Sequence, residues 1–370
     1  MNMAIEPLRH LAPTSSPAPH RPEPPVGPTV QIDPARIREL TARESERLDA
    51  RTQASAAAYE RAKRSLVGGV SSSYQKRAPW PIYLDRGQGQ YVWDVDGHQY
   101  LDVHNGIGSM VQGHAHPIIT EAVDRRIRLG SHFAAPPEDT YIVAEYLAAR
   151  WGIPRWRFVN SGSEATMDAS RLARGVTGRD GVMKIFGSYH GHHDYVMVDI
   201  GLSVYDGKDR ENYPSIAYGK GIPDSVTQMT TAVPFNDAGV LERRLTALQS
   251  EGKLPACLIM EAAMMNCGVI LPEPGYLAEV RRITKKFGVV WIVDEVKTGL
   301  TVAAGGATEL FGIKPDLVCL AKALGAGIPT GAIGGSDEMW AMVDTGDVYM
   351  VGTFNGNPLA MAAARANLER

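Results

Sequence analysis

The sequence predicts an α/β fold in which a mostly parallel sheet is flanked by helices, with a smaller α+β domain formed by the N-terminal segment. After about residue 117, short apolar runs that are nearly continuous alternate with helical stretches, as they do when strands are buried on both faces. Polar residues follow the ends of these runs repeatedly, and ligands bind at the carboxyl ends of strands in such sheets. We therefore expect one large domain with a binding site at the edge of its sheet.

The N-terminal segment is of a different kind. Residues 1–33 are crowded with proline and have few periodic apolar residues, so we expect a flexible tail. Asp33 followed by Pro34 predicts a helix start, and the mixed charges of residues 35–50 place that helix on a surface of the protein or against a partner subunit. The alternating residues 90–103 around Asp96 and Gly97 predict a β-hairpin.

The larger part divides into predicted strands and helices. The apolar runs predicted as strands are residues 156–160, 181–187, 256–262, 289–295 and 316–322. The helical stretches between them include residues 163–176, 238–252 and 274–288.

Composition excludes several classes of protein. The formal net charge is −3, and the basic residues are scattered, so we expect no nucleic-acid partner. The chain contains no apolar run long enough for a membrane span, so we expect no membrane partner. Cys257, Cys267 and Cys319 lie in apolar or small-residue surroundings without CxxC spacing, which favours reduced, buried thiols and a cytoplasmic location.

Four junctions carry the candidate chemistry. Asn160, Ser161, Gly162 and Ser163 stand between a strand and a helix, as either a helix cap or a seat for an anion at the helix N-terminus. Tyr189 and His190 follow the next predicted strand, Asp294 closes the run at 289–295, and Lys322 closes the last one. A lysine at the end of an apolar strand has to be paired or chemically used, because burying a free ammonium is costly, and a Schiff base is such a use.

These groups match the needs of one cofactor. An amine, a carboxylate for a ring nitrogen, an aromatic face and donors for a phosphate are what pyridoxal 5'-phosphate requires. No metal site is predicted, because His190, His192 and His193 have no carboxylate cluster in their pattern. The glycines of residues 325–331 have the wrong spacing for a dinucleotide site.

The motifs NSGSEA, YHGHHD, IVDEV and GTFNGNPLAMAAA, in this order, resemble the class III (subgroup II) aminotransferases, and among them the aminomutases of the glutamate-1-semialdehyde type. The resemblance covers roughly residues 65 to 370. It implies a fold-type I transferase with a seven-stranded-type sheet, pyridoxal 5'-phosphate as cofactor, a small-molecule amino donor and carbonyl acceptor, and a homodimer with shared active sites. It also implies that the chain stops before a C-terminal small domain, which favours a partial chain.

The family's roles are carried over residue by residue. Lys322 resembles the Schiff-base lysine and general base, and Asp294 the partner of the ring nitrogen. The remaining residues that the resemblance implies for cofactor binding are Tyr189 and Val296 on the two ring faces, His190 beside Tyr189, Asn266 near the ring hydroxyl, and Ser161, Gly162 and Ser163 at the phosphate, with Gly352 and Thr353 reaching the phosphate of the neighbouring subunit.

The resemblance and the element pattern together predict domain limits. We expect a tail at 1–33, an N-terminal helix and small-domain segment at 34–110, and the large cofactor-binding domain at 111–350. Residues 351–370 then form the inter-subunit phosphate loop and the start of a helix.

Three departures bear on the substrate. Gln75 stands where the family commonly has an arginine for the substrate carboxylate, Met264 and Met265 bring bulk near the ring, and the loop 200–220 is longer than the family's gate. The main expectation is therefore an aminotransferase acting on an amine or a β- or ω-amino acid with a keto acid or aldehyde. An intramolecular aminomutase, an ammonia lyase and a non-catalytic cofactor-binding protein stay open as alternatives.

Overall fold

The computed structural model describes residues 33–199 and 212–370. The predicted tail, apart from Asp33, and most of the predicted long loop 200–220 lie outside the described residues. The chain divides into two compact units, Met1–Ile82 and Tyr83–Arg370, which are taken separately below. The predicted domain limits near residues 110 and 350 remain predictions.

The described part of the first unit is helical. It contains α1 (Pro34–Arg51), α2 (Gln53–Ala62) and the 3-10 turns η1 (Val67–Gly69) and η2 (Ser73–Gln75). Asp33 caps α1 as predicted, since its side chain accepts a hydrogen bond from the backbone N–H of Ala35 at 2.8 Å. No residue of α1 is buried, as its mixed charges predict.

The second unit begins with a small antiparallel sheet. Its strands are β1 (Leu84–Gln88), β2 (Tyr91–Asp94) and β3 (Gln99–Leu101). The predicted hairpin is confirmed, because β2 and β3 pair antiparallel across a turn in which Gly97 has a φ of 89°.

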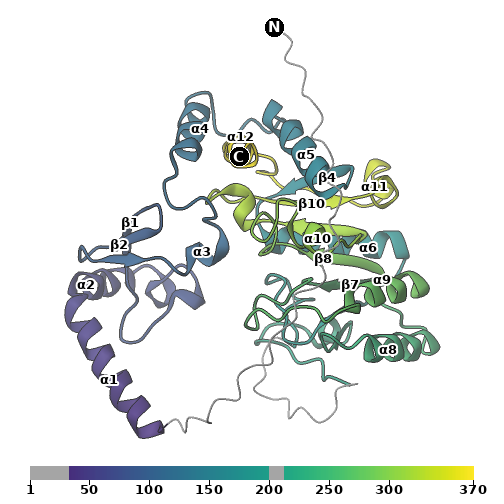
Figure 1. The fold of residues 1–370 in the computed structure, drawn as a ribbon, viewed down its shortest axis with the longest axis horizontal. Coiled ribbons are helices and arrows are strands. Elements are labelled where there is room, and N and C mark those ends of the chain that lie inside the picture. Colours follow the sequence, from purple (N-terminus) through teal and green to yellow (C-terminus); the bar gives the residue numbers. More distant parts are fainter. Residues whose placement is uncertain (1–32, 200–211) are drawn as a thin grey trace. The chain divides into compact units, whose positions relative to one another are not determined.

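A seven-stranded sheet forms the centre of the second unit (Figure 1). Its spatial order is β4-β10-β9-β8-β7-β5-β6, and only β10 runs antiparallel to its neighbours. The bounds are β4 (Arg155–Val159), β5 (Val182–Ile185), β6 (Thr230–Val233), β7 (Cys257–Met260), β8 (Val290–Asp294), β9 (Leu317–Leu320) and β10 (Gly331–Gly335). All five predicted strands are confirmed, and the mostly parallel sheet with them.

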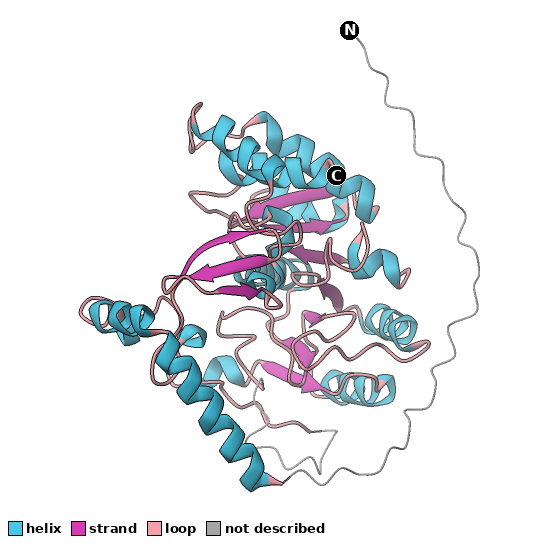
Figure 2. Cartoon of the chain, turned by 60° about the vertical axis from the view of Figure 1, so that its left-hand side comes forward, coloured by secondary structure: helices cyan, strands magenta, loops and turns pink. Residues whose placement is uncertain are grey.

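Helices pack against both faces of this sheet (Figure 2). Helix α6 (Gly162–Thr177) covers one face and packs against α11 (Asp337–Asp344). On the other face lie α5 (Glu138–Trp151), α8 (Ala238–Ser250), α9 (Tyr276–Phe287) and α12 (Pro358–Leu368). Helix α12 packs between α5 and α4 (Pro117–Ile127). The short elements are α3 (Asn105–Gly108), α7 (Asp224–Thr227), α10 (Gly306–Leu310) and η3 (Lys322–Gly325).

Two expectations from composition can be compared with the structure. Within the described residues, no helix has both the length and the apolar character that crossing a membrane requires. Cys257 and Cys319 are buried free thiols as predicted, whereas the prediction that Cys267 is buried is wrong: it is exposed, and its thiol donates to the carbonyl of Gly187 at 3.1 Å.

Candidate active site

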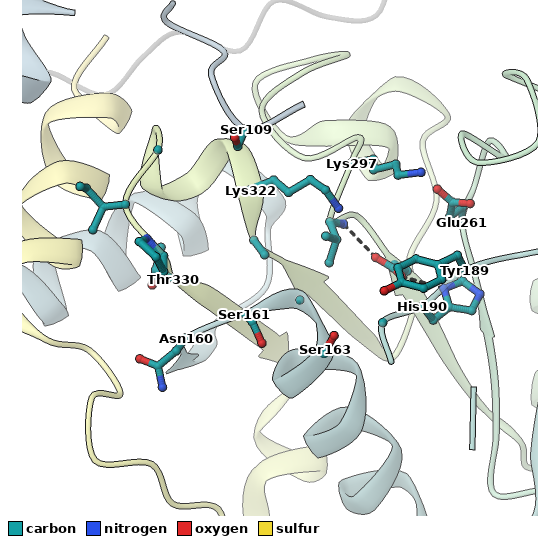
Figure 3. A pocket seen from close by; sticks show the side chains of 18 residues that line it. Ser109, Asn160, Ser161, Ser163, Tyr189, His190, Glu261, Lys297, Lys322 and Thr330 are labelled. Carbon is teal, nitrogen blue, oxygen red and sulfur yellow. Dashed lines mark hydrogen bonds and ion pairs between the residues drawn. The ribbon is translucent and has the colours of Figure 1, made fainter. Parts of the chain in front are cut away.

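A cavity of about 340 Å³ opens at one edge of the large sheet (Figure 3). The carboxyl ends of β4, β5, β7, β8 and β9 meet there because these strands run in the same direction. Strand β10 runs the other way, so the residues that precede it, 327–330, also line the cavity. The sequence-predicted residues that line it are Ser161, Gly162, Ser163, Tyr189, His190, Asp294, Val296 and Lys322.

Asp294 is held rigidly at the floor of this cavity. It ends β8, is 4% exposed, and accepts hydrogen bonds from the backbone N–H of Val296 at 2.9 Å and from His190 Nδ1 at 2.7 Å. Burial lowers the pKa of His190, and Asp294 only partly opposes that effect. His190 is therefore a neutral ring that donates to the carboxylate and fixes its orientation.

Lys322 reaches the cavity from a strained backbone. It follows β9, and its φ of 44° lies in the left-handed region that a side chain with a Cβ rarely adopts. Burial lowers the pKa of its ammonium, Asp294 raises it, and a second lysine, Lys297, lowers it further. A lysine with a lowered pKa has more neutral amine at neutral pH and is a better nucleophile and base.

Helix α6 begins at the cavity wall. The hydroxyl of Ser161 accepts a hydrogen bond from the backbone N–H of Glu164 at 3.2 Å, so the helix-cap interpretation is confirmed. The first-turn N–H groups of Gly162 and Ser163 have no acceptor within the helix and lie at its positive end. The cap and the anion seat are therefore compatible.

The cavity fits a flat, phosphorylated ring. A Cβ on Gly162 would come within 2.8 Å of Val296 Cγ1, and one on Gly191 within 2.6 Å of Ser163 Oγ, so glycine keeps this space open at both points. Tyr189 is half-buried, and burial raises the pKa of its phenol, which keeps the ring neutral. One cavity is thus surrounded by N–H donors for a phosphate, a buried carboxylate, a neutral aromatic ring and a reactive amine.

Two charged residues that the sequence analysis did not select also line the cavity. Glu261 follows β7 directly, is 3% exposed, and its Oε2 has no partner. Burial and the neighbouring Asp294 raise the pKa of Glu261 to about 8. Lys297 stands three residues after Asp294 and donates to Asn266 Oδ1 at 2.6 Å. The sequence signal was a charged residue at the end of an apolar run: Glu261 lies near the end of the predicted strand 256–262, and Lys297 stands two residues after the predicted strand 289–295.

Two further buried charges support the loops around the cavity. Lys184, within β5, is fully buried and donates to the carbonyls of Ser188, Val196 and Val198. Burial lowers the pKa of this ammonium to about 8. Glu295, also fully buried, accepts from the backbone N–H groups of Ala307 and Thr308 and so anchors α10.

Other predicted residues lie outside the cavity lining. Asn266 is exposed and reaches the site only through Lys297. Gly352 and Thr353 line a different cavity, of about 1010 Å³, with residues of α5 and β4. Met264 is packed in the core between the sheet and α9, and Met265 does not line the cavity either. The expectation that both methionines bring bulk to the ring is therefore wrong.

Gln75 and the histidines complete the comparison. Gln75 lies in the first unit, where its side chain accepts from the backbone N–H of Ser72 at 3.1 Å. His192 Nδ1 lies 3.1 Å from Ser163 Oγ, and His193 is packed against Thr166. Among the described residues no cluster of side chains could hold a metal ion.

This fold, with an amine, a carboxylate and an anion seat at the carboxyl ends of its strands, defines an enzyme that uses pyridoxal 5'-phosphate. The model of the class III aminotransferases matches residues 72–370, and the chain belongs to this family. The resemblance proposed from the motifs is thereby confirmed, as are its fold and its cofactor, pyridoxal 5'-phosphate.

The similar proteins include both aminomutases and transaminases. The chain is 42% identical over 314 residues to the glutamate-1-semialdehyde 2,1-aminomutase of Methanocaldococcus jannaschii, a match that covers 84% of this chain and 71% of that protein. Among solved structures, an omega-transaminase from Sphaerobacter thermophilus is 36% identical with a TM-score of 0.81, covering 85% of this chain and 72% of that one. A glutamate-1-semialdehyde-aminomutase from Pseudomonas aeruginosa is 30% identical with a TM-score of 0.81, covering 91% and 74%.

Proposed function

We propose that this enzyme transfers an amino group between an amine or a β- or ω-amino acid and a keto acid or aldehyde, through Lys322. The observation that carries the proposal is that Lys322 and Asp294 line one cavity with the open first turn of α6. Likeness to an omega-transaminase supports this assignment.

Different residues would bind the phosphate, the ring nitrogen and the two ring faces of the cofactor. Ser161, Gly162 and Ser163 would bind its phosphate at the N-terminus of α6. Asp294, oriented by His190, would keep a proton on the ring nitrogen, while Tyr189 and Val296 would cover the two ring faces. The bound cofactor supplies a carbonyl carbon that carries the amino group and a ring that makes the neighbouring C–H acidic.

Lys322 would move the protons. Its lowered pKa increases the share of neutral amine, and Nζ would accept the proton from the substrate carbon that bears the amino group. The same Nζ would then donate that proton to the carbonyl carbon that the cofactor supplies. Glu261, with its raised pKa, adds no second full negative charge next to Asp294 at neutral pH.

A second candidate is an intramolecular aminomutase, because the sequence relatives at about 40% identity are named glutamate-1-semialdehyde 2,1-aminomutases. The two reactions separate in a single assay. A transaminase converts its amino donor continuously only when a keto acid or aldehyde is added, whereas an aminomutase needs no added acceptor. We expect turnover with an ω-amino acid to stop after one equivalent when the acceptor is left out.

We also propose a homodimer with shared active sites in the cytoplasm. Gly352 and Thr353 lie apart from the cavity of their own chain, which supports a role in the neighbouring site. The free, buried thiols of Cys257 and Cys319 are in keeping with a reducing compartment.

The lysine assignment has its own test. Lys322→Ala should lower kcat by about 10³-fold or more, because it removes both nucleophile and base, while the cofactor still binds without a covalent link. Absorption spectra and equilibrium dialysis measure the binding. Lys314→Ala, at an exposed lysine, is the matched control and should leave both unchanged. Normal turnover in Lys322→Ala would refute the assignment.

A further inference from the structure

The candidate active site contains a second lysine that the mechanism above does not use. Lys297 lines the cavity together with Lys322, and its ammonium donates to the neutral side chain of Asn266 at 2.6 Å. Within residues 33–199 and 212–370, no carboxylate lies within ion-pair distance of Lys297. A cation at the cavity wall that has only a neutral partner can bind an anionic group of a ligand.

The two acidic residues of the cavity do not supply such an anionic group. Asp294 is committed to His190 and to the backbone N–H of Val296. Glu261 lies near enough to Lys297 for the ammonium to lower its pKa, yet burial still holds that pKa at about 8. Near neutral pH Glu261 is therefore mostly protonated, and the charge of Lys297 stays available to the cavity.

The cofactor phosphate has its own seat elsewhere. Ser161 and Ser163, at the start of α6, lie in the lower half of the view in Figure 3, whereas Lys297 and Lys322 lie in its upper half. The field of Lys297 also reaches the amine of Lys322, whose pKa it lowers. An anion held by Lys297 would therefore sit close to the atom that exchanges the amino group.

We propose that Lys297 is a specificity-determining residue that binds a carboxylate of the amino substrate, so that the enzyme prefers amino acids to amines without a carboxylate. This inference rests on the proposed amino transfer and adds a substrate class to it. Asn266 positions the ammonium through its Oδ1. Binding a carboxylate at a lysine needs only a point charge and a few donors, which an ammonium on a flexible stem provides.

The test compares two amino donors that differ only in the carboxylate, 4-aminobutyrate and butylamine. Lys297→Gln should lower kcat/KM for 4-aminobutyrate by about 10- to 100-fold relative to that for butylamine, because the effect of the lost charge on the amine of Lys322 acts on both donors alike. Lys297→Arg should keep most of the activity towards 4-aminobutyrate. Lys253→Gln, which removes an exposed positive charge on another loop, should change neither donor.

A second readout does not depend on turnover. Butyrate, which has the carboxylate and no amine, should bind the cofactor-loaded wild-type enzyme, and Lys297→Gln should raise its dissociation constant by about tenfold in a calorimetric titration. An unchanged butyrate affinity, or an equal loss for both donors, overturns the role of Lys297. A wild-type enzyme that binds butyrate in a Lys297-dependent way but transfers no amino group refutes only the proposed function.

Discussion

At the scale of single residues, the pairing of Asp294 with Glu261 decides how the site responds to pH. Their strands are neighbours, and Met260 of β7 lies opposite Val293 of β8. The next residues of the two strands, Glu261 and Asp294, therefore lie side by side. When two carboxyl groups are buried next to each other, the negative charge of one raises the pKa of the other. Asp294 has a donor on each oxygen, whereas Glu261 Oε2 has none, and burial together with the nearby Asp294 raises the pKa of Glu261 to about 8.

Glu261→Gln should make the cofactor-free protein less sensitive to alkaline pH. The pKa of Glu261 is raised from 4.5 to about 8, so the folded protein keeps a proton that the unfolded chain has released. That contribution to stability is full below the ordinary pKa and is lost as the pH rises through 8. Glutamine keeps the shape without titrating. The Tm of the variant minus that of wild type should therefore grow by about 2–6 °C between pH 6 and pH 9 in thermal scans.

Glu251→Gln is the control for this measurement, because Glu251 is exposed at the end of α8 and pairs with Lys253 at the surface. Its Tm difference from wild type should stay constant over the same pH range. A flat difference for Glu261→Gln as well would mean that Glu261 is ionised in the folded protein.

At the scale of elements, the loop that carries Tyr189 and His190 depends on one buried ammonium. Lys184 donates to three carbonyls of residues 188–198, which follow β5. Lys184→Met fills nearly the same volume and leaves all three carbonyls unpaired, at a cost of about 2–5 kcal/mol. We expect a lower Tm and, because Tyr189 and His190 lose their support, a cofactor dissociation constant raised at least about tenfold.

Calorimetry and cofactor titration measure the two effects. Lys253→Met, at an exposed position, should change neither quantity. If Lys184→Met destabilised the protein but left cofactor affinity intact, the loop would hold its shape without the ammonium, and the proposed support of Tyr189 and His190 would be wrong.

The same scale explains which parts of the fold the sequence could predict. Apolar runs predicted five of the six parallel strands, and the Asp33 cap and the hairpin at Gly97 followed from local rules. The sixth parallel strand, β6 at the end of the sheet, was not predicted. Strand β10 was missed because three of its five residues are glycine. Gly334 has to be glycine there, since a Cβ would come within 2.6 Å of the ring of Trp156, a contact that only the folded sheet creates.

The candidate site was predictable for a related reason. Residues at strand ends, such as Asp294 and Lys322, stand out because they interrupt an apolar run. Glu261 and Lys297 likewise stand at the ends of strands, after β7 and β8, but whether such a side chain points into the cavity depends on the neighbouring strands. Lys184 looks like one polar residue in an apolar run, and only the carbonyls around it explain why it is buried.

At the scale of the whole molecule, the position of Thr353 bears on assembly. Thr353 lines the second cavity, and the neighbouring apolar side chains Tyr349, Val351 and Phe354 are 75%, 68% and 55% exposed in the single chain. An exposed apolar cluster of this kind is typical of a surface that another protein covers. A second copy seated there would cover the cluster and could bring Thr353 to its own Lys322 cavity.

Mixed dimers of two damaged chains test this arrangement. Thr353→Val should raise the cofactor dissociation constant by about tenfold, since it removes one hydrogen bond to a charged group, and Lys322→Ala abolishes turnover. If sites are shared, a dimer of one chain of each kind has one site with Lys322 and the partner's Thr353, both intact. That site should bind cofactor with wild-type affinity and give about half the wild-type rate.

If each chain builds its site alone, the only site with Lys322 also carries the valine, and its cofactor affinity should match that of the Thr353→Val homodimer. Cofactor titration of purified, differently tagged mixed dimers distinguishes the two results, and the second would refute the shared site.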